Sequence, residues 1–410
     1  METDAPHGDL HDDDDGISED VAIIIDNGSG VCKAGLSTDD KPTAVFPSVV
    51  GMPREAYRNS IDGDIFFGDD VLPFGDNVSP EVLDRCSKLS VHYPLENGII
   101  ENFDHMERLW EYAILDKLNV NPHRHPVLLT EPPYNPKPNR EKMVEIMFEA
   151  FDVPMLNVSI QGVLALFEAG RMTGLVLDSG EGVTHTLPIF QGFGLPHCIN
   201  RMDIAGRELN TLLAKLLAAA SAQGLDKGVC LTKTTEQQHV RKMKERFCYV
   251  ASDPYKEFPE PATYKLPDGR EVTLTDERWQ TPEALFDPSL VGFETGTLGV
   301  AGMVWNSISR CDIDVRRKLL NTVVLSGGST MFPGFTERLS DELRKFAPPA
   351  SYRDVRVVAD TKKPRDQTVW RGAQVFTGLR TMSEHQWISR EEYEEFGAHL
   401  VHDRLAVKYS

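Results

Sequence analysis

The sequence predicts an α/β protein made of two domains with related cores. Two observations support this prediction. Strand and helix patterns alternate along the chain, and the alternation runs through twice. At 410 residues the chain is also long for a single hydrophobic core. Three glycine-rich turns follow short apolar strands, at Asp26-Asn27-Gly28-Ser29-Gly30, Asp178-Ser179-Gly180-Glu181-Gly182 and Ser326-Gly327-Gly328-Ser329-Thr330.

The first two turns have the features of anion-binding hairpins. A β-branched run that ends at Asn27-Gly28 predicts a type I′ turn, which needs a positive φ at both central residues. Because glycine has no Cβ atom, the backbone N–H groups of such a turn can close around an anion. Two such hairpins that face each other would grip the β- and γ-phosphates of a nucleotide from both sides.

Three charged residues lie where a phosphate clamp would use them. Asp26 and Asp178 stand where each strand enters its turn, and two carboxylates that act through water are sufficient to hold Mg²⁺. Lys33 follows the first hairpin and could reach the β-phosphate as a point charge. Taken alone, each aspartate is equally well explained as a turn residue, but the duplicated context favours the functional interpretation.

Hydrolysis of the nucleotide would need a water molecule in line behind the γ-phosphate, because phosphoryl transfer depends mainly on positioning and charge neutralisation. Gln161 and His185 are the candidates for that task. Taken singly, the histidine is more often a core or strand residue and the glutamine a helix cap. Neither residue alone therefore predicts catalysis.

The first half of the chain begins its alternation with a strand and turn at 44–51. Residues 52–90 are rich in Gly, Pro, Asn and Asp, and we expect them to form an irregular, exposed excursion. Apolar residues at i, i+3 and i+4 spacing predict a helix over 103–114. The remaining elements expected here are a buried strand at 127–130, a helix that opens at 139–141 and a helix over 159–170.

The second half repeats this plan. A strand hairpin is expected at 175–190, followed by a helix that carries leucines from 209 to 217. Residues 221–294 resemble a second excursion, with a short helix at 236–250 and a strand pair near Asp268-Gly269. A helical segment is expected at 305–308. The third glycine turn opens another helix at 335–346, and strands and a helix close the chain.

The composition limits the class of partner. A net charge of −20 opposes extended contact with nucleic acid or with an anionic membrane, and favours basic protein partners and a bound Mg²⁺. Six scattered cysteines indicate reduced, buried thiols, and no signal peptide or long apolar run is present, so we expect a soluble intracellular protein. The acidic residues 1–20 are expected to be a disordered tail, either simply solvated or a site that captures a basic partner.

These residues resemble the actin superfamily from about Val21 to Lys408. The three glycine turns resemble the two phosphate loops and the adenosine-side loop of that family. One glycine loop is a weak signal, but several motifs in the same order and spacing are a strong one. The further matching segments are His125 to Glu131, Asn139 to Lys142, Met147 to Glu149, Asp203 to Arg207 and Pro282 to Phe286.

The resemblance implies duplicated ribonuclease-H-like domains, as in actin, hexokinase and heat-shock chaperones, around a central nucleotide cleft. It divides the chain into the tail at 1–20, a first domain at 21–168 plus 369–410, and a second domain at 169–368. Each domain would have an outer subdomain, at 52–93 in the first and at 207–293 in the second. Residues 286–298 match the apolar plug that joins filament strands, and residues 52–66 match the loop that inserts into the next subunit.

The resemblance also implies a site for ATP or ADP with Mg²⁺ or Ca²⁺. Gln161, His185 and Asp178 are the expected catalytic residues, and Asp26, Gln161 and Asp178 would hold the metal ion mainly through water. The expected nucleotide-binding residues are Gly28, Ser29, Gly30, Val31, Lys33, Gly180, Glu181, Gly182, Val183, Gly206, Arg241, Lys244, Glu245, Gly327, Gly328, Ser329, Met331 and Phe332.

Several positions depart from the family pattern. Glu181 stands where actin has aspartate, Asn97 where it has a modified histidine, Phe332 where it has tyrosine, and Asp366 where it has a lysine over the adenine. The segment 68–93 is also longer than in actin, and the insertion loop is slightly shorter. These differences bear on ATP affinity and on self-assembly.

Three functions are consistent with the sequence. The first is a slow Mg-dependent ATPase of the cytoskeleton that forms, joins or templates filaments with itself or with actin. The second is a non-polymerising scaffold subunit of a branching, dynein-associated or chromatin-remodelling complex that uses ATP structurally, in the cytoplasm or the nucleus. The third, a sugar kinase or chaperone ATPase, is disfavoured because the outer segments resemble actin and no sugar site is evident.

Overall fold

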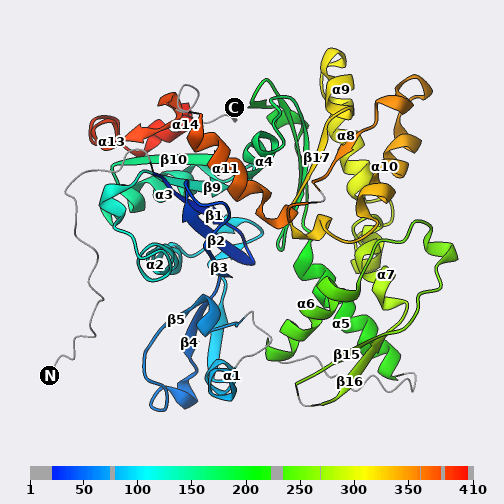
Figure 1. The fold of residues 1–410 in the computed structure, drawn as a ribbon, viewed down its shortest axis with the longest axis horizontal. Helices are drawn as coiled ribbons and strands as arrows, with labels where there is room; N and C mark the ends of the chain where they lie inside the picture. Colours follow the sequence, from blue (N-terminus) through cyan, green and yellow to red (C-terminus); the bar gives the residue numbers. More distant parts are fainter. Residues whose placement is uncertain are drawn as a thin grey trace.

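The computed structural model describes residues 21–73, 79–222, 234–267, 269–360, 362–379 and 384–404. The expected acidic tail at 1–20 lies outside these residues. Two large sheets stand side by side in the upper part of the molecule, and two smaller parts lie below them (Figure 1). Within the described residues no helix is long and apolar enough to cross a bilayer.

The first large sheet has six strands in the order β19-β10-β9-β1-β2-β3. β1 pairs antiparallel with β2 and parallel with β9, so the first glycine turn lies at the end of a hairpin in the middle of the sheet. The β1 residues are all buried, because neighbouring elements cover both faces. The strands are β1 (Ile23–Asn27), β2 (Val31–Leu36), β3 (Ala44–Pro47), β9 (Val127–Glu131), β10 (Met155–Ile160) and β19 (Ile388–Ser389).

The second large sheet repeats this pairing pattern. β11 pairs antiparallel with β12 and parallel with β17, which in turn pairs parallel with β18. The two hairpins expected at the first and second glycine turns are therefore confirmed. The strands are β11 (Gly174–Ser179), β12 (Thr184–Phe190), β13 (Phe193–Gly194) and β14 (Asn200–Met202), both paired with β12, and β17 (Val323–Ser326) and β18 (Val357–Val358).

Two helices, α4 (Gln161–Glu168) and α11 (Thr368–Gly378), pack against each other between the large sheets (Figure 1). Their backbones meet closely, because a Cβ atom on Gly372 would lie 1.9 Å from the carbonyl oxygen of Leu164. Trp370 of α11 is fully buried, and its indole donates a hydrogen bond to the carbonyl of Ile24 at 3.3 Å. One apolar cluster thus joins both sheets through these helices.

Further helices cover the outer faces of the two sheets. Helices were expected at 103–114, from 139–141, at 305–308 and at 335–346, and the structure has helices at 103–111, 137–149, 300–310 and 335–346. The first of them continues as a π-helical turn over Tyr112–Lys117. Beside the first sheet lie α2 (Phe103–Glu111), α3 (Lys137–Glu149), α13 (Arg390–Phe396) and α14 (Val401–Arg404). Beside the second lie α8 (Val300–Arg310), α9 (Ile313–Leu320) and α10 (Phe335–Phe346).

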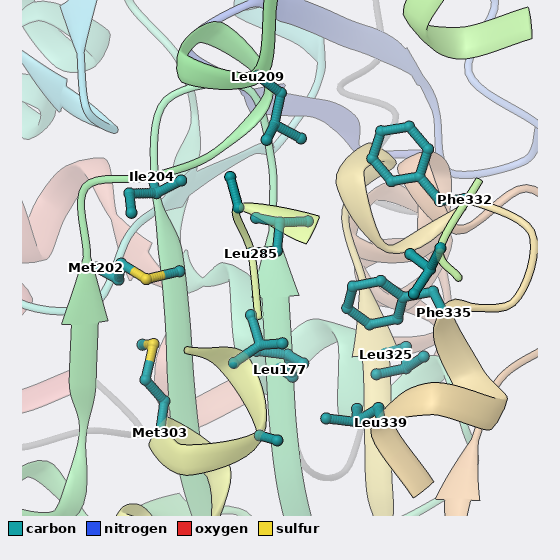
Figure 2. Close-up of a cluster of buried hydrophobic side chains, with 14 of the residues drawn as sticks. Leu177, Met202, Ile204, Leu209, Leu285, Met303, Leu325, Phe332, Phe335 and Leu339 are labelled. Atoms are coloured by element: carbon teal, nitrogen blue, oxygen red, sulfur yellow. The ribbon is translucent and has the colours of Figure 1, made fainter. Parts of the chain in front are cut away.

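We call each large sheet, with the helices on it and the smaller part below it, a lobe. In the second lobe one large hydrophobic cluster joins the sheet to α8, α9 and α10. Figure 2 shows side chains from both faces of this packing, with Leu177 and Leu325 from the sheet facing Phe335 and Leu339 from α10. Phe332 belongs to the same cluster and also lines the cavity described below. The third glycine turn is therefore attached directly to a packed core.

The smaller part below the first large sheet differs from what the sequence predicts. Residues 52–90 are only partly irregular, because a three-stranded sheet in the order β5-β4-β6 and a helix form there, whereas residues 58–65 contain neither helix nor strand. The strands of this sheet are too short to show an alternation of apolar and polar residues, and Val50 pairs with the distant His92. The elements are β4 (Val50–Pro53), β5 (Phe66–Phe67), α1 (Pro80–Ser87) and β6 (Leu89–His92).

The lower part of the second lobe also has regular structure. The expected short helix and the strand pair near 268 are both confirmed. The elements are α5 (Gly206–Ala222), α6 (Thr234–Phe247), β15 (Ala262–Lys265), β16 (Glu271–Leu274) and α7 (Glu277–Glu283).

Candidate functional site

A cavity of about 370 Å³ lies where the glycine turns of the two sheets meet, a size typical of small-molecule sites. All the residues expected at the site line this cavity except His185 and Gly206. The expected residues that line it are Asp26, Gly28, Ser29, Gly30, Val31, Lys33, Gln161, Asp178, Gly180, Glu181, Gly182, Val183, Arg241, Lys244, Glu245, Gly327, Gly328, Ser329, Met331 and Phe332.

The first turn is a hairpin but not of the expected type. Neither Asn27 nor Gly28 has a positive φ, and the Gly28 N–H donates to the carbonyl of Asp26 at 3.1 Å. The Asn27 side chain is instead buried and accepts a hydrogen bond from the Trp110 indole at 2.9 Å. This tertiary contact, which the local sequence does not encode, overrides the Asn-Gly turn preference.

The Asn-Gly turn with positive φ lies elsewhere, at Asn97 and Gly98, where φ is 48° and 84°. It joins the short strands β7 (Leu95–Glu96) and β8 (Ile99–Ile100). The Gly98 N–H donates to the Ser29 hydroxyl at 2.7 Å, so this hairpin supports the first glycine turn from outside.

The second and third turns are bonded to each other. The Ser329 hydroxyl donates to the carbonyl of Gly180 at 2.7 Å. Gly327 has a φ of 85°, and a Cβ atom there would lie 2.2 Å from the carbonyl oxygen of Ser179. Only glycine fits this close approach, so the two turns form one continuous wall of the cavity.

The first and second turns also touch, although they belong to different sheets. A Cβ atom on Gly30 would lie 2.5 Å from Cγ and 2.7 Å from Cβ of Glu181. A Cβ atom on Gly182 would lie 3.0 Å from the Ser29 side chain. The two turns therefore meet at the cavity, and their glycines permit the close approach.

Substitution of Gly30 by alanine should push the two turns apart. The added methyl group overlaps the stem of Glu181, so we expect a loss of about 1–3 kcal/mol in stability from overpacking. Thermal unfolding of the apoprotein measures this effect. Gly378→Ala is the matched control, because nothing lies within 4 Å of its added methyl group, and an equal loss in both variants would contradict the proposed contact.

The carboxylate at the first turn is held by two partners. Asp26 accepts a hydrogen bond from the Thr130 hydroxyl at 2.9 Å, and its second oxygen lies 3.4 Å from the Lys33 ammonium. Both residues are buried, so the pair is little screened by solvent. Thr130, near the end of β9, thus orients the Asp26 carboxylate that lines the cavity.

The carboxylate at the second turn is less well compensated. Burial, with a smaller contribution from the negative charge of Asp26, raises the pKa of Asp178 from 3.8 to about 6. A cation placed between Asp26 and Asp178 would relieve both effects. The described residues contain no cluster of three or more His, Cys, Asp or Glu, so a divalent ion here would take most of its ligands from phosphate oxygens and water.

The two residues expected to position water differ in their placement. Gln161 lines the cavity, and its amide donates to the carbonyl of Asn27 at 3.2 Å. His185 pairs with Asp178 in the hairpin register but lies behind the cavity wall, where burial lowers its pKa to about 3. Its Nε2 atom is buried and has no hydrogen-bond partner among the described residues, so the imidazole is neutral and available to accept or donate one bond.

Gly206 also lies behind the wall, where it supports the second turn. Its N–H donates to the carbonyl of Gly180 at 3.0 Å, and its own carbonyl accepts from the Lys244 ammonium at 2.8 Å. Burial lowers the pKa of Lys244, while the charge of Glu181 acts in the opposite direction. Lys244 thus connects α6, through Gly206, to the second glycine turn.

The cavity has lining residues that the sequence interpretation did not place in it. Asn27 and Ser326 belong to the first and third glycine turns, but they were not among the residues expected to bind the nucleotide. Gly98 and Val369 come from distant segments, with no local signal. The Asp366 side chain lines the cavity next to the third turn; the sequence marks it only as a departure from the family pattern.

The comparison with known families agrees with this geometry. The family profile described as Actin matches residues 17–406, which is nearly the whole chain. The match includes all three glycine turns, both large sheets and both smaller parts of the fold. The chain belongs to the actin family.

Proposed function

We propose that this protein binds ATP or ADP, together with Mg²⁺ or Ca²⁺, in the cavity between its two lobes. The observation that carries this proposal is the contact between the two glycine turns, Gly30 against Glu181 and Gly182 against Ser29, which brings the backbones of both turns to the wall of one cavity. Lys33 adds a positive charge at the same place.

The chain's own residues suit such a ligand. The turn backbones would bind the phosphates and hold them in a fixed orientation, while Asp26 and Asp178 orient the water shell of the divalent ion. The ion, when bound, supplies charge neutralisation for the phosphates. Gln161 lies on the cavity wall and can orient a water molecule. His185, which is paired with Asp178 in the hairpin, has a buried nitrogen without a hydrogen-bond partner among the described residues.

On this basis we propose a slow ATPase whose nucleotide state controls the closure of the two lobes. The division into domains at 21–168 plus 369–410 and at 169–368 is part of the proposal. The matching strand orders of the two large sheets support a duplication of the ribonuclease-H type. The smaller parts at 52–93 and 207–293 would move with their own lobes.

We propose that the protein acts in the cytoskeleton, where it forms, joins or templates actin-like filaments. Exposed apolar side chains at Leu290, Phe293 and Leu298 support an intermolecular role for the segment 286–298. The alternative is a non-polymerising scaffold subunit that uses the nucleotide structurally. The position of His185 behind the cavity wall favours this alternative, because the expected catalytic pair is not assembled on one surface.

Two measurements test these proposals. Extraction of the purified protein should release ATP or ADP in near-equimolar amount, and a nucleotide-free protein that also fails to bind added Mg-ATP would refute the binding site. High-speed sedimentation with Mg-ATP, alone and with actin, then separates the two roles. Sedimentation favours the filament, whereas a soluble protein that co-purifies with a fixed set of partners favours the scaffold.

A further inference from the structure

Asp366 lines the cavity with a carboxylate that lacks a donor. Its Oδ1 atom is buried and has no hydrogen-bond partner among the described residues. The residue lies in a short 3-10 turn, η10 (Arg365–Gln367), which packs against the third glycine turn. A Cβ atom on Gly328 would lie 3.8 Å from the Cβ of Asp366, so the two residues form adjacent parts of one wall. A buried acceptor without a donor is costly unless a ligand supplies one.

The neighbouring cations are engaged elsewhere. The Arg365 guanidinium donates to the hydroxyl of Thr330 at 3.2 Å and to its carbonyl. The Arg371 guanidinium donates to Glu168 at 3.0 Å and to the carbonyl of Pro364 at 3.1 Å. Neither side chain satisfies the buried oxygen of Asp366, which leaves a group inside the cavity as the source of a hydrogen bond.

The part of the ligand that reaches Asp366 follows from the walls. Lys33 and the first two glycine turns form a polar wall suited to phosphates. Asp366 instead lies beside Gly328 of the third turn. The cavity is also lined by Phe332, which follows that turn in the chain, and by Val369, which follows Asp366, and such apolar side chains suit a planar base. A base held there would present its polar edge to the carboxylate.

We propose that Asp366 reads the base of the bound nucleotide by accepting a hydrogen bond from its amino group. This inference rests on the proposed function of the cavity, and it specifies the ligand as a nucleotide with an amino-bearing purine. Adenine offers one such donor group. Guanine offers an amino group and an adjacent ring N–H. A purine without either donor would leave the carboxylate unsatisfied, and the site would reject it.

Calorimetric titration of the wild type and Asp366→Ala with the magnesium complexes of ATP, GTP and purine riboside triphosphate tests this inference. The last compound has neither an amino group nor a ring N–H. A hydrogen bond to a charged acceptor corresponds to a preference of about tenfold to a hundredfold for the donor-bearing bases in the wild type. The preference should disappear in the variant. Asp341→Ala, on the exposed surface of α10, is the control that should keep it.

The outcomes are distinct. A wild-type preference for ATP or for GTP that Asp366→Ala abolishes supports the inference and identifies the base. If the ratios of the three affinities are the same in the wild type and in Asp366→Ala, the inference is overturned and the proposed function stays intact. Failure of the wild type to bind any of the three nucleotides overturns both the inference and the proposed function.

A second measurement needs no nucleotide. Because Asp366→Ala removes an unsatisfied carboxylate, it should raise the unfolding temperature of the apoprotein, and a decrease would count against the inference.

Discussion

Asp178→Ala is expected to weaken the binding of Mg-ATP by about tenfold to a hundredfold, the range found when a residue that orients metal ligands is removed. Asp178 lines the cavity at the entrance to the second glycine turn and faces Asp26, which stands in the same place at the first turn. Removal of one carboxylate leaves the divalent ion with an oriented water shell on one side only. Titration with a fluorescent ATP analogue at fixed Mg²⁺ measures the change.

Loss of the Asp178 charge should have the opposite effect on the apoprotein, and Asp178→Asn is the variant that tests it. Burial raises the pKa of Asp178 to about 6, so between its ordinary value of 3.8 and about 6 the folded protein holds a proton that the unfolded chain releases. The protonated carboxyl group therefore stabilises the folded protein below pH 3.8, and this contribution is lost as the pH rises through about 6. Asp178→Asn should flatten this pH dependence and stabilise the apoprotein above about pH 6.

The two readouts together make the assignment testable. The affinity of the wild type for Mg-ATP should fall as the pH drops below about 6, because the ion needs the charged form of Asp178. The affinity of Asp178→Asn should be lower and should lack this dependence. Asp341→Ala, which changes an exposed carboxylate on α10, should behave as the wild type in both assays. Equal Mg-ATP affinities in all variants would show that Asp178 does not serve the ion.

The sequence predicts this fold well where local pattern and tertiary structure agree. The helix at 335–346 has the expected bounds, because its apolar residues repeat at helical spacing on a packed face. The hairpins at the first and second glycine turns are also where expected. The three-stranded sheet around β4 was missed, because its strands are very short and are defined by pairing with residues up to 42 positions away, as in Val50 with His92.

The candidate site also contains residues that the local sequence predicts and residues that it does not. Turn residues could be predicted because glycine spacing is local. Gly98, Val369 and Asp366 reach the cavity only through the packing of distant segments, so their presence in it could not be read from the local pattern. The turn type at Asn27 was wrong for a related reason, since the bond from Trp110 lies 83 residues away in the chain. Local propensity is a weak guide wherever a buried polar side chain has a distant partner.

Arg140→Met is expected to destabilise the protein by about 3–5 kcal/mol, the cost of leaving one member of a buried ion pair without its partner. Arg140 and Glu131 are almost fully buried, and the guanidinium lies 2.7 Å from the carboxylate. Burial raises the pKa of Glu131, and the charge of Arg140 opposes that rise. Removal of Arg140 would therefore raise this pKa further. Urea denaturation measures the loss, which should be larger at higher pH because the glutamate must then ionise without its partner.

The effect should also reach the nucleotide cavity. Glu131 is the last residue of β9, and its neighbour Thr130 donates to the Asp26 carboxylate at 2.9 Å. The double variant Arg140→Met with Glu131→Gln separates charge from packing, because it removes both charges while keeping similar volumes. We expect it to recover most of the lost stability and to bind Mg-ATP more tightly than the single variant. If the double variant is as unstable as the single one, shape and not the unpaired charge dominates at this position, and the ion pair does not fix the strand end that orients Asp26.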